Sequence, residues 1–277
     1  MKIIDRLKTR IKKWYWTYFW DTYQLPEEDI NNIIENYTEH VPSIMEEICI
    51  PPYHGDKGLL DYPILISIVK SMQPKIILEL GTAHGNTVAN ICAESNAKIY
   101  TVNALPQQIE GEVVTFNLSR ETIGSVYIKN GYKDRVTQIY ANTKDMDLLN
   151  YMEPKSVDLA FIDACHDFDF VINDFHKILP ILSEDGVILF HDVHPSCNLH
   201  YAGSYFAGMY LRTKGFNVRY ISGSSLGIWA IKEEKTSEKE RNFFKHLFFY
   251  LIGRSYYGNG QVYIDRVSKL KLSQLKY

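Results

Sequence analysis

Apolar residues along the chain occur in short runs that alternate with longer stretches of helical period. Five runs are short and apolar enough to be buried strands, at 76–80, 98–103, 135–140, 157–163 and 187–190. Apolar residues recur every three or four positions in the segments that predict helices, at 61–72, from 86 onward, around 170–179 and at 200–214. Strands that alternate with helices predict a mostly parallel sheet with helices on both faces.

The pattern changes towards the C-terminus. Residues 216–222 and 227–232 are two apolar runs separated by a Gly/Ser turn, which predicts a closing hairpin, and 236–252 has the period of a final helix. Residues 182–186 indicate a turn, and 104–134 are too long for a plain crossover, so we expect one or two helices and a flap there. The expected fold is a doubly wound α/β fold. It has a mostly parallel seven-stranded sheet, an antiparallel C-terminal strand and added N- and C-terminal helices.

Three parts follow from this organisation. Residues 1–54 are expected to form a helical extension that is first basic and then aromatic, and 55–235 to form the α/β domain. Residues 236–277 are expected to be a C-terminal helix and a basic tail. A chain of 277 residues is long enough for one large core with such appendages.

Charge is distributed unevenly over these parts. The net charge is −3, but residues 1–20 and 236–277 each carry +5, so the 16 basic and 29 acidic residues of 21–235 leave −13. An acidic body would repel the phosphates of nucleic acid, so we expect no nucleic-acid partner.

Six of the seven residues at 14–20 are aromatic, which leaves several uses for the basic ends open. They could lie on an anionic membrane, with lysines at the headgroups and tryptophans at the interface. They could instead form the interface of a homo-oligomer or pack on the domain itself, which is the default expectation because aromatic stripes are more often core.

The spacing of the cysteines and the length of the apolar segments indicate in which cellular compartment the protein is expected. The four cysteines, at 49, 92, 165 and 197, form no close pair, so neither a zinc knuckle nor a redox motif is indicated. No secretory signal and no long uninterrupted apolar segment is evident. We expect a cytoplasmic protein, with a peripheral position at the inner face of the membrane as the alternative.

A glycine turn follows the first strand of the sheet. Gly81 and Gly85 separate that strand from a helix that opens at 86–87. A strand, a glycine turn and a helix form a nucleotide pocket, because glycines let the backbone approach a ligand. The spacing Gly-x-x-x-Gly differs from the dinucleotide pattern Gly-x-Gly-x-x-Gly, so a nicotinamide-dependent reductase is disfavoured.

Polar residues mark the ends of the other parallel strands. They are Asn103, Asn142, Asp163 and the pair His191-Asp192. Ligands of such folds bind at the carboxyl ends of the strands, so we expect these residues to surround one cleft. Asp163 also precedes a helix, so a helix-capping role is an alternative for it.

Several motifs in this order carry a resemblance to a known family. They are the turn Glu79-x-Gly81-x-x-x-Gly85, Ser119-Arg120-Glu121-x-Ile123-Gly124 before Arg135-Val136-Thr137, Phe161-Ile162-Asp163-x-x-His166, and Leu182-x-x-x-Gly186-Val187-Ile188-x-Phe190-His191-Asp192. Over about residues 55–232 the chain resembles class I S-adenosylmethionine-dependent methyltransferases. Within these it is most similar to metal-dependent sugar O-methyltransferases of the macrolide-sugar type.

The resemblance implies a site for S-adenosyl-L-methionine in the domain at 55–235. The residues implied to bind this cofactor are Glu79, Gly81, Thr82, Ala83, Gly85, Asn86, Thr87, Asn103, Asn142, Thr143 and Asp163. Asn103 and Asn142 stand where acidic residues often hold the ribose and the adenine region. We expect a lower affinity, because neutral hydrogen bonds are weaker than charge-assisted ones.

The resemblance also implies a divalent metal ion and a base. Asp163, His191 and Asp192 would be the metal ligands, and His166 would take the proton of the acceptor hydroxyl. His191 replaces the glutamate or other residue that precedes the second aspartate in the family. A metal lowers the pKa of a hydroxyl and a base completes its deprotonation. Mg2+ is the first expectation, and Mn2+ or Fe2+ are alternatives because two histidines and a carboxylate suit them better.

The expected activity is therefore S-adenosylmethionine-dependent O-methylation of a sugar hydroxyl in a small-molecule or glycan acceptor. Two alternatives stay open at this point. One is a metal-dependent oxygenase on the same fold, and the other is a non-catalytic membrane-associated or scaffolding protein that retains the fold.

Overall fold

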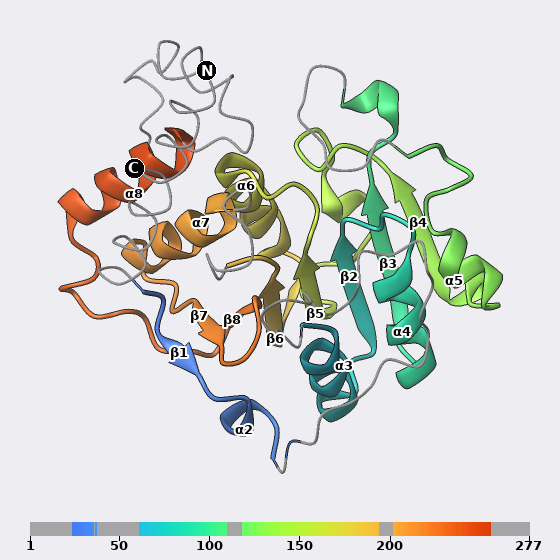
Figure 1. The fold of residues 1–277 in the computed structure, drawn as a ribbon, viewed down its shortest axis with the longest axis horizontal. Helices are drawn as coiled ribbons and strands as arrows, with labels where there is room; N and C mark the ends of the chain where they lie inside the picture. Colours follow the sequence, from blue (N-terminus) through green and yellow to red (C-terminus); the bar gives the residue numbers. More distant parts are fainter. Residues whose placement is uncertain (1–23, 36, 38–60, 110–117, 194–201, 256–277) are drawn as a thin grey trace, which may run out of the picture.

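The computed structural model describes residues 24–35, 37, 61–109, 118–193 and 202–255. These residues form one twisted sheet between two layers of helices (Figure 1). The predictions made for residues 1–20, for most of 21–60 and for the tail beyond 255 lie outside the described residues.

The sheet has the strand order β1-β7-β8-β6-β5-β2-β3-β4. Its strands are β1 (Glu27–Glu28), β2 (Ile76–Leu80), β3 (Lys98–Asn103), β4 (Val136–Tyr140), β5 (Val157–Ile162), β6 (Leu182–Phe190), β7 (Arg219–Ile221) and β8 (Gly227–Ala230). The five central strands from β6 to β4 are mutually parallel. Strand β8 runs antiparallel to both β6 and β7. The predicted doubly wound α/β fold with an antiparallel C-terminal strand is confirmed.

Two details of the sheet differ from prediction. The sheet has eight strands rather than seven, because Glu27 and Glu28 pair in parallel with β7. Two glutamates carry no apolar signal. Backbone hydrogen bonds from the Tyr220 and Ser222 N–H groups attach this strand, together with an ion pair between the buried Glu28 and Arg219. Strand β6 begins at Leu182 rather than at Val187. The expected turn belongs to the strand, because Leu182 pairs with Val157 and the register then shifts.

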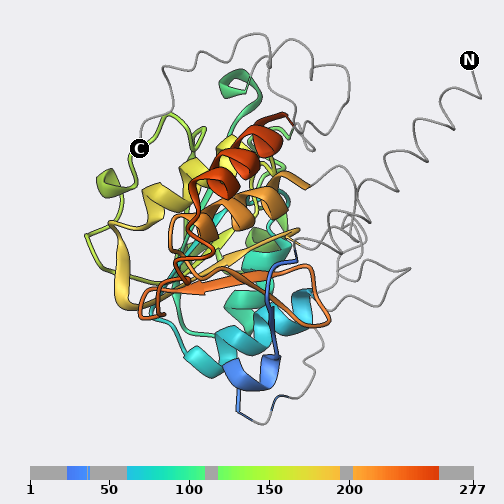
Figure 2. The ribbon, with the colours of Figure 1, turned by 90° about the vertical axis from the view of Figure 1, so that its left-hand side faces the viewer.

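Helices cover both faces of the sheet (Figure 2). One layer holds α3 (Asp61–Met72), α4 (Asn86–Glu94) and α5 (Ser125–Lys129), and the other holds α6 (Phe168–Ile178), α7 (Ala202–Thr213) and α8 (Phe243–Ser255). Successive side chains of β5 point to opposite faces of the sheet and so contribute to both hydrophobic cores. Leu159 and Phe161 face the first helix layer, and Ala160 and Ile162 face the second. The central strands are therefore buried on both faces, which is why they read as continuous apolar runs.

The remaining elements are short. They are α2 (Ile30–Ile33) and the 3-10 turns η1 (Pro106–Gln108), η2 (Lys133–Arg135) and η3 (Leu148–Asn150). The final helix begins at Phe243 instead of residue 236, because the Asn242 side chain accepts the Phe244 N–H at 2.8 Å and so caps the helix there. No helix among the described residues is both long and apolar enough to cross a membrane.

Candidate functional site

The glycine turn lies directly against the end of β5. Gly81 has a φ of +112°, and a Cβ atom at this position would stand 2.2 Å from the carbonyl oxygen of Asp163. Gly85 has a φ of +83° and donates its N–H to the Thr82 carbonyl at 2.8 Å, immediately before α4. Both positions need glycine, because a side chain would be strained at either and would collide with the neighbouring backbone at Gly81.

A chain of buried hydrogen bonds supports this turn from below. Thr101 Oγ1 donates to Glu79 at 2.6 Å, and the hydroxyls of Thr82 and Thr101 lie 2.6 Å apart. Gln138 Nε2 donates to Thr82 Oγ1 at 3.0 Å, and the Tyr127 hydroxyl donates to Gln138 Oε1 at 3.1 Å. Because the Thr101 hydroxyl donates its proton to Glu79, it accepts the proton of the Thr82 hydroxyl. All hydrogen bonds of the chain therefore donate in the same direction, from Tyr127 towards Glu79.

Glu79 is fully buried at the end of this chain. Burial raises the pKa of its carboxyl to about 8, although hydrogen bonds from Thr101 and Thr87 act in the opposite direction. The described hydrogen bond of Glu79 goes into the sheet and holds the turn from beneath. Its role as a cofactor contact stays a prediction.

The two asparagines at strand ends bind neighbouring loops. Asn103 accepts the Ala83 N–H at 3.0 Å and donates to the Ala104 carbonyl at 2.8 Å, so it braces the glycine turn. Asn142 accepts the Lys144 N–H at 3.1 Å and donates to the Gln108 carbonyl at 3.2 Å. Both therefore shape the rim of the candidate site at these strand ends. Direct contact of either side chain with the cofactor stays a prediction.

Three further residues implied by the resemblance surround the same rim. Asn86 is buried in the first turn of α4, and the Thr87 hydroxyl lies 3.0 Å from the Tyr62 hydroxyl. Thr143 is also buried, and its carbonyl accepts the ammonium of Lys177 at 2.6 Å. These contacts fix the residues in place, and their roles as cofactor contacts stay predictions.

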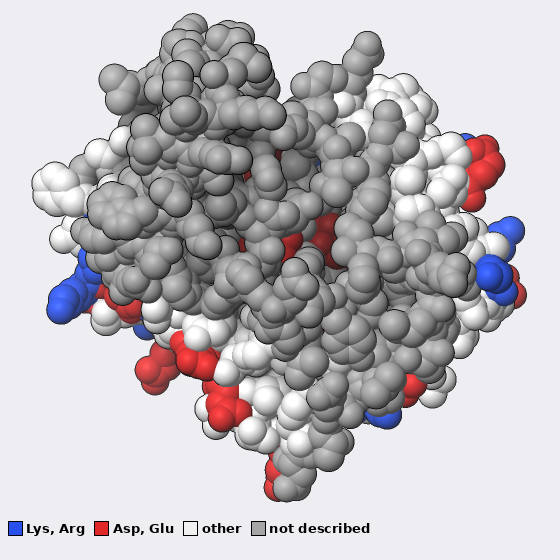
Figure 3. Space-filling model, in the orientation of Figure 1, with Lys and Arg blue, Asp and Glu red and all other residues white. Residues whose placement is uncertain are grey.

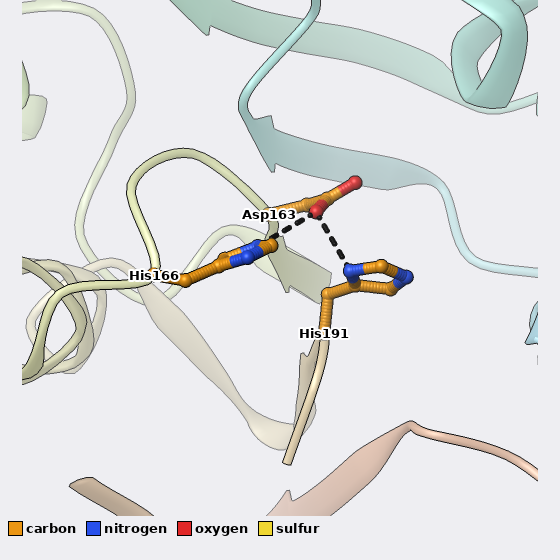
Figure 4. Close-up of side chains that lie close together, drawn as sticks. All are labelled: Asp163, His166 and His191. Carbon is orange, nitrogen blue, oxygen red and sulfur yellow. Dashed lines mark hydrogen bonds and ion pairs between the residues drawn. The ribbon is translucent and has the colours of Figure 1, made fainter. Parts of the chain in front are cut away.

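Asp163, His166 and His191 form a cluster at the carboxyl ends of β5 and β6 (Figure 4). His166 Nε2 lies 3.2 Å and His191 Nδ1 lies 3.1 Å from Asp163 Oδ1. One possible ligand atom from each residue lies within 4.8 Å of the others. The three side chains come from the end of β5, the loop after it and the end of β6. The parallel sheet thus brings together residues that are distant in the sequence.

Two buried carboxylates stand behind the imidazoles. Asp192 Oδ2 lies 3.2 Å from His166 Nδ1 and 3.5 Å from His191 Nδ1. Asp61 Oδ2, at the start of α3, lies 3.6 Å from His191 Nε2. Asp192 has a φ of +55°, a conformation that residues other than glycine rarely adopt.

The charges of the cluster are strongly coupled. Burial lowers the pKa of the His166 imidazole, but Asp163 and Asp192 outweigh it and raise that pKa to about 9. Burial also opposes charge on His191, yet the same two carboxylates raise its pKa well above the usual range. Burial would raise the pKa of Asp163 and Asp192, but the histidines hold both below the usual range. Within the protein alone, two imidazolium ions therefore balance these carboxylates at neutral pH.

The structure brings Asp163, His166, His191 and Asp192 to one edge of the sheet, as predicted. The metal-binding geometry includes His166, expected as the base, and does not include Asp192, expected as a ligand. The assignment of ligand and base roles stays a prediction. Asp61 escaped the sequence analysis, because an acidic residue at a helix start normally indicates only a favourable helix dipole.

Acidic atoms are visible near the centre of the face drawn in Figure 3, and both acidic and basic side chains lie at its edges.

Residues 78–193 match the model of a methyltransferase domain family. Over these residues the chain is similar to a methyltransferase domain. This domain match begins within β2 and ends just after β6, so it includes both the glycine turn and the histidine-aspartate cluster. The domain match supports the predicted methyltransferase over these residues.

The methyltransferase domain also has distant relatives. The chain is 25% identical over 203 residues to the protein y4gI of Sinorhizobium fredii, a match that covers 70% of this chain and 22% of that protein. The chain therefore spans about a fifth of the length of this curated relative.

Two solved structures are similar to part of the chain. A methyltransferase of Podospora anserina, PaMTH1, bound to SAH, shares 20% identity over 63% of this chain and 79% of its own, with a TM-score of 0.46. An O-methyltransferase of Bacillus cereus in complex with SAH shares 19% identity over 60% and 77%, with a TM-score of 0.44.

Proposed function

We propose that the chain transfers a methyl group from S-adenosyl-L-methionine to a hydroxyl oxygen of a small-molecule or glycan acceptor. The proposal rests on one observation: the glycine turn and the histidine-aspartate cluster adjoin. The missing Cβ of Gly81 leaves room for the backbone of Asp163, whose carboxylate belongs to the cluster. A methyl donor at the turn and a polarised hydroxyl at the cluster would be neighbours, as methyl transfer requires.

The donor would bind at the turn. The first backbone N–H groups of α4 follow Gly85 and have no helical acceptor, which suits a charged or polar ligand. The acceptor would bind at the cluster, where a sugar hydroxyl must lose its proton before it becomes a good nucleophile. The sugar is the acceptor class that the motif resemblance favours.

Two chemistries of the cluster could activate such a hydroxyl. His166 could take the proton as a general base, or a divalent ion held by the cluster could lower the pKa of the hydroxyl. Both place the activated oxygen beside Asp163, so the proposed methyl transfer does not depend on the choice between them.

The binding half of the proposal is tested by calorimetry with S-adenosylmethionine and its demethylated product. The wild-type chain should bind both, and Asn103→Ala should bind about tenfold more weakly because the turn loses its brace at Ala83. Asn130→Ala is the matched control, since Asn130 donates to the Val126 carbonyl at the end of α5. If the wild-type chain shows no binding of either compound, the proposal is wrong.

The transfer half is tested with the donor and a panel of mono-, oligo- and nucleotide sugars, by searching for products that gain one methylene in mass. Oxygen uptake with Fe2+, without any methylated product, would contradict the proposal and favour the oxygenase. Methylation of amines or carbon acids but of no hydroxyl would retain the donor and overturn the acceptor class.

A further inference from the structure

We infer that Asp61 and Asp192 orient the imidazoles of His191 and His166, so that the two imidazoles and Asp163 form a centre for a divalent transition-metal ion in preference to Mg2+. The inference rests on the proposed function insofar as it specifies the ion and the supporting residues of the same cluster. It makes His166 a ligand rather than the base.

Each imidazole has one nitrogen directed at Asp163 and the other at a buried carboxylate. His166 presents Nε2 to Asp163 and Nδ1 to Asp192, both at 3.2 Å. His191 presents Nδ1 to Asp163 at 3.1 Å and Nε2 to Asp61 at 3.6 Å. Histidines that bind metal ions usually donate their other N–H to a carboxylate, which fixes the tautomer and the ring orientation. His166 meets that requirement, with Asp192 at 3.2 Å. For His191 the carboxylate of Asp61 stands on the correct side of the ring, at an ion-pair distance of 3.6 Å.

The spacing of the ligand atoms also fits. Neighbouring ligand atoms around an ion with metal–ligand bonds of about 2.0–2.2 Å lie about 2.8–3.6 Å apart, from octahedral to tetrahedral geometry. Both imidazole nitrogens lie at about this separation from Asp163 Oδ1. The donor atoms come from one short loop and two adjacent strand ends, which the hydrogen-bonded sheet holds together.

The supporting carboxylates are built into the fold. Asp61 is buried and accepts two hydrogen bonds from Ser225, from the backbone N–H at 2.5 Å and from the hydroxyl at 2.7 Å. The Ser225 carbonyl in turn accepts the N–H of Val193 at 2.9 Å, so the loop between β7 and β8 connects Asp61 to the end of β6. Contacts of this kind hold Asp61 in position whether or not an ion is bound.

Asp192 is also held in a fixed position by the fold. Its side chain is buried and its backbone has a φ of +55°, a strained conformation that persists only where the surroundings fix it. Strain of this kind is typical of functional sites. It places the carboxylate of Asp192 beside the two imidazoles, within 3.5 Å of a nitrogen of each.

The donor atoms decide which ion is preferred. Mg2+ favours oxygen ligands in a nearly ideal octahedron and retains several waters, whereas imidazole nitrogens favour Fe2+, Co2+, Cu2+ and Zn2+. A centre with two nitrogen ligands and one carboxylate therefore selects the second group. When bound, such an ion would lower the pKa of a coordinated hydroxyl.

The first experiment measures ion binding to the chelator-treated full chain, without any methyl donor. Calorimetry should show Co2+ and Zn2+ binding at least about tenfold more tightly than Mg2+. Pulsed EPR of the Cu2+-loaded chain should show modulation from the remote nitrogens of two imidazoles. Binding of Mg2+ as tight as that of Co2+, or a spectrum without imidazole nitrogens, would overturn the inference.

The second experiment tests Asp61 as a positioning residue. Asp61→Asn should weaken Co2+ binding by about 10–100-fold and change the remote-nitrogen frequencies of one imidazole in the Cu2+ spectrum. The matched control is Asp158→Asn. Asp158 accepts the N–H groups of Lys75 and Ile76 at the opposite end of the sheet, so it tests the loss of a structural carboxylate alone. Equal Co2+ affinity in both variants and the wild type would refute the role of Asp61.

A further variant keeps the inference testable if Asp61→Asn does not fold. His166→Gln should leave the Cu2+ spectrum with one imidazole instead of two, and a spectrum with two would contradict the ligand assignment. Binding of S-adenosylmethionine is measured on the same samples. If the chelator-treated protein binds no Co2+ and still transfers the methyl group, this inference is wrong and the proposed function stands. Tight Co2+ binding without any binding of the methyl donor overturns the proposed function alone.

Discussion

Asp163 links the two halves of the candidate site through a single residue. Its carboxylate contacts both imidazoles, and its N–H donates to the Leu80 carbonyl at 2.8 Å. Its carbonyl oxygen occupies the space that a side chain at Gly81 would need. A change at the glycine turn is therefore transmitted to the cluster through the backbone, without any contact to a ligand.

The replacement Gly81→Ala should destabilise the protein strongly and disturb the cluster. A Cβ atom would lie 2.2 Å from Asp163 O, and backbone cannot yield as a flexible side chain does. Gly131→Ala is the control, because Gly131 also has a positive φ, +82°, but has no atom within 4 Å of the added Cβ. Unfolding in urea should show a loss of about 1–2 kcal/mol for the control, from the left-handed conformation alone, and a clearly larger loss for Gly81→Ala. Equal losses would contradict the proposed steric contact.

The residues of the cluster could be predicted because they stand at strand ends, where a parallel sheet brings distant positions together. Their division of labour could not. Whether a carboxylate binds an ion directly or contacts the far nitrogen of an imidazole depends on torsion angles such as the φ of +55° at Asp192. The pattern of apolar and polar residues does not predict such angles. Asp61 depends on the packing of α3 against the loop that holds Ser225, more than 160 residues later in the chain. Such contacts require the whole fold.

At the scale of elements, α6 holds the loop that follows β4. The ammonium of Lys177 donates to three carbonyl oxygens of this loop, those of Thr143 at 2.6 Å, Lys144 at 2.7 Å and Met146 at 2.6 Å. One charged side chain therefore satisfies three backbone acceptors at the end of a strand. The loop includes Asn142 and Thr143, which line the rim of the candidate cofactor site.

The replacement Lys177→Met should lower the free energy of unfolding by about 2 kcal/mol, because hydrogen bonds from a charged donor are lost and the carbonyls become unsatisfied. Urea denaturation measures this loss. Lys155→Met is the control, since the exposed ammonium of Lys155 has the exposed carboxylate of Glu184 as its described partner, at 3.3 Å. Its midpoint should change little. If the two variants behave alike, the loop does not depend on Lys177.

Helices and strands with a strong pattern of apolar residues were predicted most accurately. Helix α3 was predicted with its observed bounds, Asp61–Met72, because a proline lies near its start and an apolar face runs through it. Strand β1 was missed because backbone hydrogen bonds and an ion pair hold it, and its own two residues are glutamates without an apolar signal. The start of α8 was placed too early, since the sequence did not show that Asn242 would cap the helix.

For the whole molecule, both predicted appendages contribute an element to the described fold. Strand β1 extends the sheet beside β7, and α8 packs on α6 and α7. Arg254 of α8 pairs with Asp169 at 3.0 Å, and Phe249 is almost completely buried. The domain boundaries after residues 54 and 235 stay predictions. So does the surface expected from the basic ends, because Trp14 to Trp20 lie outside the described residues.

Stability of the whole fold should depend on pH through Glu79. Its carboxyl has a pKa of about 8 in the folded protein, because burial disfavours the charge, and an ordinary value near 4.5 in the unfolded chain. The folded state therefore binds this proton more tightly. Stability from Glu79 is fully present below about pH 4.5 and is lost as the pH rises towards 8, by up to about 1.4 kcal/mol for each pH unit in this window.

The replacement Glu79→Gln removes this dependence while it retains an acceptor for the Thr101 hydroxyl. Urea denaturation at pH 5, 6, 7 and 8 should show the free energy of unfolding of the wild type falling relative to that of the variant. Their difference should grow in favour of the variant as the pH rises. Glu153→Gln, at an exposed position, controls for the loss of an acidic residue and should give a curve parallel to the wild type. A constant difference between the Glu79→Gln and wild-type curves would show that the Glu79 carboxyl titrates alike in the folded and unfolded chain. The hydrogen-bond chain from Tyr127 would then end on a charged carboxylate at the centre of the sheet.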